Sequence, residues 1–320
     1  MIIVTGAAGF IGSCIVSELN RSGYRDIITV DILRENDKWK NLRHLDFADY
    51  LDRGQLPSFL QSAEHIEAII HMGACSATTE RDASYLMENN YRYTLFLAQF
   101  CVENNIRFIY ASSAASYGMG EQGYDDDESA LQNLRPMNMY GYSKQIFDLK
   151  ARREGWLNRM VGLKFFNVYG PNEYFKGEMA SVIFKAFNQI KESGQVRLFK
   201  SHRPDYEDGE QLRDFVYVKD AVAIVLYLLE HPHVNGIFNV GTGKARSFKD
   251  LVTATFKAMD LEPNIVYIDM PQEIRDRYQY FTEAKMEKLR KAGYNKSFYS
   301  LEEGIRDYVR NYLNKNYAHF

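Results

Sequence analysis

Hydrophobic positions in the first half of the chain alternate between short runs and longer helical patterns. The short runs are rich in β-branched residues and predict buried parallel strands at residues 2–5, 27–31, 68–72, 107–111 and 161–166. The clearest helical pattern runs from about residue 80 to 104, with one apolar face made by Met87, Tyr91, Leu95, Ala98 and Val102. This alternation predicts an α/β fold with a doubly wound, Rossmann-like parallel sheet.

The hydrophobic pattern loosens after Val168. Two further strands are predicted at Phe215–Val218 and Ile237–Val240, on either side of an apolar helix at 219–230. A capping box, Ser300-x-x-Glu303, predicts the start of a C-terminal helix.

Two polar stretches interrupt this pattern. The acidic run Asp125–Glu128 and the segment His202–Gln211 predict solvated surface loops. The second contains Pro, Gly and alternating charge, which suits either a mobile lid or a simple insertion.

Composition and charge exclude several classes of protein. The 39 Lys+Arg and 42 Asp+Glu leave a net charge of −3, and 46% of residues are hydrophobic, which argues against a disordered chain or a nucleic-acid binder. Three cysteines without a CxxC pair and seven scattered histidines predict a reducing compartment and no metal site. The first residues lack a basic leader pattern, and the longest apolar run, Ala221–Leu229, is too short to span a bilayer. We therefore expect a cytoplasmic protein without a membrane partner.

Three glycines, Gly6, Gly9 and Gly12, directly follow the first predicted strand. Glycine permits a tight turn and a close backbone approach to a pyrophosphate, and the following helix offers unpaired N–H groups to that anion. The spacing is GxxGxxG rather than GxGxxG, and its place at the start of a βαβ unit favours dinucleotide binding over a plain turn.

Asp31 ends the second predicted strand, where an acid bonds the adenosine ribose of a dinucleotide. An acid there favours NAD because it repels a 2′-phosphate. Arg34, Lys38 and Arg53 follow and could neutralise both groups. The residues alone leave NAD and NADP equally supported.

Ser113 ends the fourth predicted strand, and Tyr140 and Lys144 follow it on one face of a helix. Hydride transfer from an alcohol needs a base, a cation that lowers the pKa of that base and a group that orients the hydroxyl. Tyrosine, lysine and serine supply these three functions.

The glycine segment, Ser113 and Tyr140-x-x-x-Lys144 together resemble the extended short-chain dehydrogenase/reductase family, the NAD-dependent epimerases and dehydratases of nucleotide sugars. The finer resemblance is to the epimerases within it that act on ADP-heptoses. It covers nearly the whole chain and is carried by His71–Glu80, Tyr110–Gly118, Phe165–Pro171, Lys176-Gly177, Met179–Val182, Arg213–Val218 and Arg277–Gln279.

The resemblance implies a role for each residue of the site. Together with the glycine motif, the cofactor contacts are Gly6, Gly9, Phe10, Ile11, Gly12, Asp31, Ile32, Lys38, Arg53, Met72, Gly73, Ala74, Cys75, Ser76, Asn89, Tyr140, Lys144, Val168 and Lys176. The substrate contacts are Ser113, Asn167, Glu178, Lys185, Phe199, Lys200, Ser201, His202, Arg213 and Tyr278. The catalytic set is Tyr140, Lys144, Ser113 and Lys176.

Three positions depart from the family pattern. Met72 stands where Glu is usual, Arg53 replaces Lys, and Glu178 replaces a small Ser beside the substrate. An acid is unfavourable next to a diphosphate, so the presence of Glu178 argues against a substrate contact at this position.

Two absences narrow the reaction. Ala114-Ala115 occupy the place of the Asp-Glu pair of sugar 4,6-dehydratases, and Ala114 and Lys176 replace the Cys and His of enzymes like GDP-fucose synthase. The expected reaction is thus redox without dehydration: interconversion of two ADP-heptoses epimeric at C6, for lipopolysaccharide core synthesis, with NADP favoured by the family habit and NAD possible. The alternatives are a UDP-hexose 4-epimerase and a non-catalytic NAD(P)-sensing scaffold.

Two domains are expected. Residues 1–167 with 214–242 would form the dinucleotide-binding domain, and residues 168–213 with 243–320 a smaller α/β domain for the sugar nucleotide. The family resemblance also implies a homopentamer.

Overall fold

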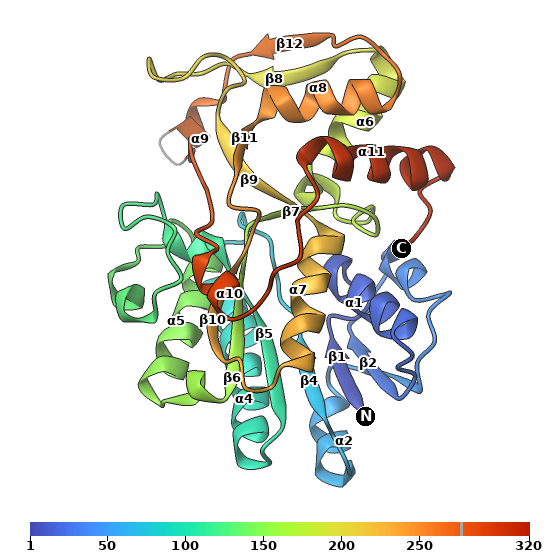
Figure 1. Ribbon diagram of the computed structural model, residues 1–320, viewed down its shortest axis with the longest axis vertical. Helices are drawn as coiled ribbons and strands as arrows, with labels where there is room; N and C mark the ends of the chain where they lie inside the picture. The colour runs from blue at the N-terminus through green and yellow to red at the C-terminus, as the bar shows by residue number, and fades with distance from the viewer. Residues whose placement is uncertain (276–277) are drawn as a thin grey trace.

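A seven-stranded parallel sheet forms the centre of the molecule (Figure 1). The computed structural model describes residues 1–275 and 278–320. The strands lie in the order β10-β6-β5-β4-β1-β2-β3, and every neighbouring pair is parallel. Their bounds are β1 Ile2–Thr5, β2 Ile27–Asp31, β3 Asp49–Asp52, β4 Ala68–His71, β5 Arg107–Ser113, β6 Met160–Phe165 and β10 Gly236–Val240. This arrangement confirms the predicted doubly wound α/β fold.

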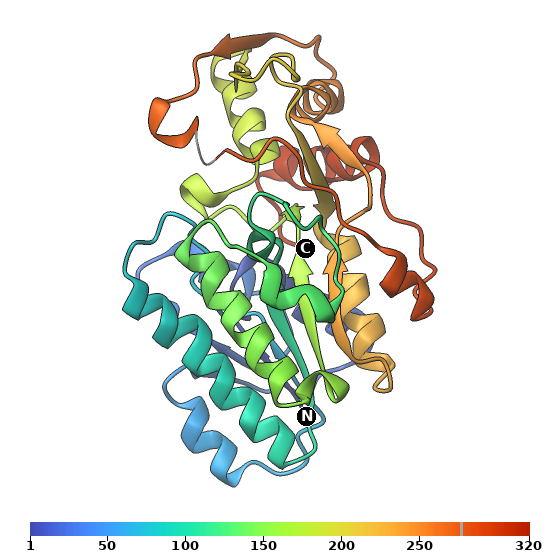
Figure 2. The same cartoon turned by 90° about the vertical axis from the view of Figure 1, so that its left-hand side faces the viewer.

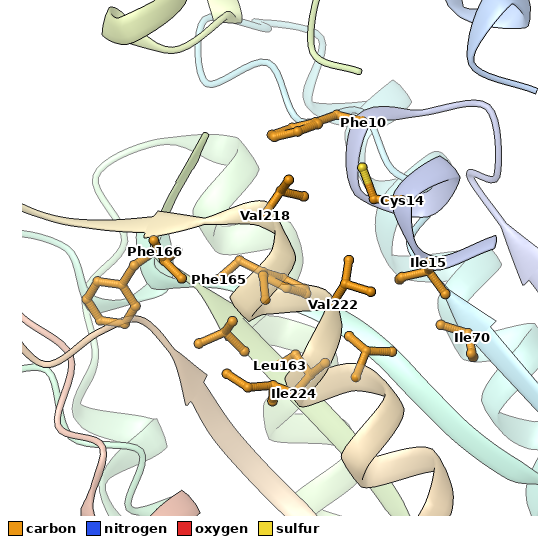
Figure 3. Packing of buried hydrophobic residues seen from close by; sticks show 14 of the residues in the cluster. Phe10, Cys14, Ile15, Ile70, Leu163, Phe165, Phe166, Val218, Val222 and Ile224 are labelled. Atoms are coloured by element: carbon orange, nitrogen blue, oxygen red, sulfur yellow. The ribbon is translucent and has the colours of Figure 1, made fainter. Parts of the chain in front are cut away.

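Helices cover both faces of this sheet. Helices α2 (Leu56–Ser62), α4 (Tyr93–Glu103) and α5 (Met139–Arg153) lie on the face that Figure 2 turns toward the viewer. Helices α1 (Phe10–Arg21) and α7 (Val218–Glu230) pack against each other on the opposite face. In Figure 3, side chains of α7 such as Val222 lie among Leu163 of β6 and Ile15 of α1, in one continuous hydrophobic core.

A smaller group of strands and helices lies beyond the carboxyl ends of the central strands, at the top of Figure 1. Its three-stranded sheet has the order β11-β9-β7, and β12 pairs with β8 in a two-stranded sheet. The strands are β7 Asn167–Tyr169, β8 Val196–Phe199, β9 Leu212–Tyr217, β11 Ala245–Ser247 and β12 Ile265–Ile268. The later helices are α6 Val182–Ser193, α8 Phe248–Ala258, α9 Gln272–Arg275, α10 Glu287–Lys291 and α11 Leu301–Asn311, of which α10 lies beside β10.

Short helical turns complete the chain. They are η1 Asp37–Asn41, α3 Ala83–Leu86, η2 Met87–Arg92, η3 Ala114–Tyr117, η4 Glu128–Asn133, η5 Trp156–Asn158, η6 Gly177–Met179 and η7 Leu313–Lys315. Among the described residues, no helix has the length and apolar character needed to cross a membrane.

The predicted strands are confirmed at the five apolar runs of the first half and at the two later runs. The predicted capping box is also confirmed: Ser300 Oγ accepts from Glu303 N, and the Glu303 carboxylate accepts from Ser300 N at 2.9 Å. The strand β3 was missed, because its half-exposed residues do not form an apolar run.

The predicted apolar face of the helix near residues 80–104 is confirmed in part. Leu95 and Ala98 are buried as predicted, whereas Met87, Tyr91 and Val102 are only partly buried. The other buried residues of this segment are Leu86, Asn90, Thr94, Leu97 and Cys101. The segment contains a π-helical turn, η2, so its side chains do not follow an uninterrupted 3.6-residue period.

The acidic run Asp125–Glu128 is not the solvated loop that was predicted. Asp126 is buried and accepts a hydrogen bond from Asn239 N at 2.8 Å, and Glu128 accepts from Ile237 N at 2.9 Å. These carboxylates accept hydrogen bonds from alternate N–H groups along the outer edge of β10, which has no neighbouring strand in the described part of the chain. Burial raises the pKa of Asp126 to about 6.

The expected division into two domains remains a proposal. The strand β9 extends across its boundary at residue 213/214 and pairs with β7 and β11 rather than with the central sheet. After β9, the chain therefore returns to the dinucleotide-binding part with α7, which packs against α1, and with β10, which joins the central sheet.

Candidate active site

A cavity of about 790 Å³ lies at the carboxyl ends of β1, β4, β5 and β6. Its wall begins at the glycine loop, continues through the ends of these strands and reaches Phe215, Phe248 and Thr282 of the smaller group of elements. This is the edge at which open parallel sheets bind ligands.

The glycine loop is built for close approach of two backbones. Gly6 has φ +67°, and a Cβ on it would lie 2.6 Å from Gly73 N. A Cβ on Gly12 would lie 2.1 Å from Gly6 O. Helix α1 begins at Phe10 with Gly9 as its N-cap, and no side chain caps it. The first N–H groups of α1 are thus available to an anion, as a dinucleotide pyrophosphate requires.

A second cavity of about 210 Å³ adjoins the glycine loop beside Asp31. The Asp31 carboxylate accepts hydrogen bonds from Ala8 N at 2.8 Å, Ile32 N at 2.7 Å and Lys38 Nζ at 2.6 Å. Arg34 and Arg53 line the same cavity. Its walls carry one carboxylate that is already paired and two further cations.

Ser113, Tyr140 and Lys144 meet in the wall of the large cavity. Ser113 ends β5, and Tyr140 and Lys144 lie on consecutive turns of α5, whose N-cap Asn138 accepts from Gly141 N. Ser113 and Tyr140 line the same cavity, and Lys144 Nζ donates to Ala111 O at 2.8 Å. The structure therefore brings together the three residues that alcohol oxidation was predicted to need.

Burial controls the protonation of this trio. Burial raises the pKa of Tyr140, and the Ser113 hydroxyl opposes that rise. Burial lowers the pKa of Lys144 to about 8, while the Asp148 carboxylate opposes the shift. An ammonium that titrates near neutrality can stabilise a phenolate and respond to small electrostatic changes.

Lys176 lines the same cavity. Its Nζ is 5.3 Å from the centre of the Phe10 ring, and the residue belongs to the segment just before η6. Burial lowers its pKa, and the buried Glu173 carboxylate opposes this effect.

Three quarters of the chain match the model of a known protein family. The model of the NAD dependent epimerase/dehydratase family matches residues 2–241. This chain belongs to that family. Its cofactor loop and its Tyr-Lys pair lie within the matched residues.

Relatives and solved structures of this family extend the similarity over the whole chain. The chain is 57% identical over 319 residues to an ADP-L-glycero-D-manno-heptose-6-epimerase of Nitratidesulfovibrio vulgaris strain DP4, with 98% of each chain covered. It is 55% identical over 327 residues to the protein of the same name from Fusobacterium nucleatum, again with 98% of each covered. The crystal structure of the Helicobacter pylori ADP-L-glycero-D-manno-heptose-6-epimerase superposes with a TM-score of 0.82 at 28% identity, covering 97% of this chain and 95% of that one.

The predicted cofactor residues lie together along the two cavities. The large cavity is lined by Gly6, Gly9, Phe10, Ile11, Gly12, Asp31, Lys38, Met72, Gly73, Ala74, Cys75, Ser76, Lys144, Val168 and Lys176. The small one adds Ile32, Arg53 and Asn89. Of the predicted substrate residues, Ser113 and Asn167 line the large cavity.

The other predicted substrate residues lie outside this wall. The Glu178 side chain is 99% exposed and pairs with Lys185 at 3.0 Å, so the acid points to solvent. Arg213 is buried behind the wall, with its guanidinium against the rings of Phe248 and Tyr278.

The segment Phe199–His202 also lies apart from the cavity. Lys200 pairs with Asp269, and His202 Nδ1 lies 2.8 Å from Tyr280 Oη, which also accepts from His202 N. A backbone hydrogen bond connects the loop within residues 202–211 to α8, since Lys249 N donates to Gly209 O at 3.0 Å. Arg277, which contributed to the family resemblance, lies outside the described residues.

Several wall residues were given no role in the site by the sequence analysis, although five of them lie in segments that carry the family resemblance. Phe165, Phe166, Phe175, Met179, Phe215, Phe248, Gln279 and Thr282 line the large cavity, and Asn36, Tyr85 and Tyr93 line the small one. Most are aromatic or aliphatic residues in a chain with 14% aromatics, where such side chains usually fill the core. Only the spatial arrangement of β6, β9 and α8 distinguishes them.

Proposed function

We propose that this chain interconverts ADP-D-glycero-β-D-manno-heptose and ADP-L-glycero-β-D-manno-heptose by oxidation at C6 and re-reduction from the opposite face. The observation that carries the proposal is the meeting of Ser113, Tyr140 and Lys144 in one cavity with an uncapped dinucleotide-binding helix. Relatives at 55–57% identity over nearly their full length carry the name of this activity.

Tyr140 acts as the base in the first half-reaction. A bound nicotinamide accepts a hydride from carbon and can return it. Tyr140 Oη takes the proton of the C6 hydroxyl, Ser113 Oγ orients that hydroxyl, and the Lys144 ammonium stabilises the phenolate. No 4,6-dehydration is expected, because Ala114 and Ala115 offer no acid–base group beside Ser113.

Re-reduction from the opposite face requires the C6 ketone to turn within the cavity. Its oxygen then points away from Tyr140, so a second group has to hold and protonate it. We assign this role to Lys176, whose desolvated side chain lines the same cavity and which the family resemblance places across it from Tyr140. The alternative role for Lys176 is to bind an anionic part of the ligand.

We infer that the cofactor is NADP rather than NAD. Lys38 already neutralises Asp31 at 2.6 Å, so this carboxylate presents little net charge to a 2′-phosphate. Arg34 and Arg53 in the same cavity supply the cations that such a phosphate would need. The uncapped N–H groups of α1 fit the pyrophosphate of either dinucleotide.

The homopentamer, the cytoplasmic location and the role in lipopolysaccharide core synthesis remain predictions of the family resemblance. The mass of the purified protein in solution tests the first of these directly.

The proposed reaction is tested by incubating the purified protein with each ADP-heptose epimer and, in parallel, with UDP-glucose. We expect either heptose epimer to yield the same mixture of both, and UDP-glucose to remain unchanged. Conversion of UDP-glucose at a comparable rate would instead indicate a 4-epimerase, and no conversion of any substrate would indicate a cofactor-sensing scaffold.

A further inference from the structure

A completely buried ion pair lies behind the catalytic face of α5. Asp148 of α5 and Lys164 of β6 have no exposed side-chain surface, and Lys164 Nζ lies 2.8 Å from Asp148 Oδ2. Asp148 is one helical turn beyond Lys144 and two turns beyond Tyr140. The pair therefore links the helix that carries Tyr140 and Lys144 to strand β6 of the central sheet.

In addition to its ion pair with Lys164, Asp148 accepts two hydrogen bonds from side chains of β5. Its Oδ2 accepts a hydrogen bond from Ser112 Oγ at 2.7 Å, and its Oδ1 accepts from Tyr110 Oη at 3.0 Å. Ser112 directly precedes Ser113. One carboxylate thus fixes the position of the end of β5, which carries Ser113, relative to α5, which carries Tyr140.

Lys164 is linked to Ser113 through the side chain of Ser116. Its Nζ donates to Ser116 Oγ, which in turn donates to Ser113 O at 2.7 Å. Lys144 Nζ donates to Ala111 O on the same strand. Ser113 is thereby held through the side chain of the residue before it and through its own carbonyl group.

The burial of the charged side chains of Asp148 and Lys164 is not explained by a contribution to the stability of the fold. A buried ion pair contributes little net stability compared with well-packed apolar residues of similar volume. A purely structural link between α5 and β6 would not require charge. The groups that act on Lys144 supply a reason for this charge. They are Asp148 from its own helix, Cys75 from the loop after β4, and the neutral His71 of β4.

We propose that Asp148 and Lys164 form a positioning pair that holds Ser113 in register with Tyr140 and keeps Lys144 in its ammonium form. Asp148 is the carboxylate that acts on Lys144, and Lys164 holds that carboxylate in place through the ion pair. This inference rests on the proposed function, since it assigns Lys144 the task of stabilising the Tyr140 phenolate.

Two variants separate charge from position. Asp148→Asn combined with Lys164→Gln removes both charges and leaves no isolated buried charge. Ser112→Ala keeps both charges and removes one link to Ser113. Lys150→Gln, on the exposed side of α5, is the matched control. Each is measured for thermal unfolding, for the pH profile of kcat, and for the pH dependence of Lys144 acetylation by mass spectrometry.

The double variant should move the alkaline limb of kcat and the acetylation midpoint of Lys144 to lower pH by about one unit. Ser112→Ala should lower kcat at least fivefold and leave both midpoints unchanged, and Lys150→Gln should match wild type. The acetylation titration needs no substrate, so it tests the charge role even if the chain proves inactive on ADP-heptose.

Two results would overturn the inference. One is a folded double variant with wild-type midpoints for both kcat and acetylation. The other is wild-type kcat in Ser112→Ala. If the double variant does not fold, Lys164→Arg serves in its place: it retains the cation, and a wild-type pH profile is expected, whereas a shifted profile would contradict the proposal.

Discussion

Lys38 Nζ lies 2.6 Å from Oδ1 of Asp31, the residue that ends the second strand of the dinucleotide-binding unit. An acid at this position is usually read as a preference for NAD. Here the acid is already paired, and the pair lines a cavity shared with Arg34 and Arg53. The charge that a cofactor meets is set by the whole cavity rather than by Asp31 alone.

Replacing Lys38 with Met should change the cofactor preference. The unpaired Asp31 carboxylate would then repel a 2′-phosphate, and loss of a charge-assisted bond typically costs about 1.5–3 kcal/mol. The dissociation constant of NADPH should rise roughly 10–100-fold, and that of NADH less than about threefold. Calorimetric titration of both cofactors measures this, with the exposed Lys40→Met as control. Equal weakening for both cofactors would refute the assignment of NADP.

Tyr140→Phe should retain the fold and the bound cofactor but lose most of the turnover. Only the oxygen that exchanges the proton is removed, and general acid–base catalysis typically contributes ~10²–10⁴-fold. Single-turnover assays of heptose epimerisation give the loss in rate. Tyr142→Phe, an exposed position on the same helix, should behave as wild type. A rate near wild type in Tyr140→Phe would show that another residue is the base.

Lys176→Met should separate the two roles considered for this lysine. If Lys176 protonates the turned ketone, the affinity for ADP-heptose should change little while kcat falls at least 100-fold. Exposed Lys191 on α6 provides the control variant. A collapse of affinity with normal turnover at saturation would make Lys176 an anchor for an anionic group.

Acid should destabilise the fold through His71. This residue is buried between Thr5 Oγ1 at 2.6 Å and Thr94 Oγ1 at 2.9 Å, and burial, with a smaller effect of Lys144, lowers its pKa from 6.5 to about 3. Below pH 6.5 the unfolded chain binds a proton that the folded chain cannot, so stability is lost as pH falls from 6.5 toward 3.

The size of this effect can be measured by urea unfolding at pH 6.5 and pH 5. Wild type should lose about 2 kcal/mol more over this interval than His71→Gln. His233→Gln, at an exposed position, should lose as much as wild type. An equal loss in wild type and His71→Gln would mean that His71 is not the group responsible.

The strands and the nucleotide loop were predictable because each depends on a local signal. Runs such as Ile2–Thr5 are buried on both faces, and the glycine motif records a backbone approach that only a residue without Cβ allows. Ser113, Tyr140 and Lys144 could be identified for a similar reason, because their residue types and spacing already indicate the chemistry of alcohol oxidation.

Features that depend on distant partners could not be read in this way. Asp126 looks like a solvated acid until β10 presents the N–H of Asn239 to it. The π-helical turn η2 interrupts the regular helical period near Met87 and Tyr91, and no glycine or proline in the sequence marks it. Phe215 and Phe248 resemble ordinary core residues, and only the folding of β9 and α8 places them in the cavity wall.

The central claim is that one site removes a hydride from C6 of the heptose and returns it to the same carbon. Incubating the purified protein with ADP-D-glycero-β-D-manno-heptose deuterated at C6, without added cofactor or reductant, tests this most directly. We predict that NMR and mass spectrometry will find the L-glycero epimer with its deuterium retained at C6. Loss of the deuterium to solvent, or an L-glycero product that forms only with added NADPH and carries hydrogen at C6, would contradict the account.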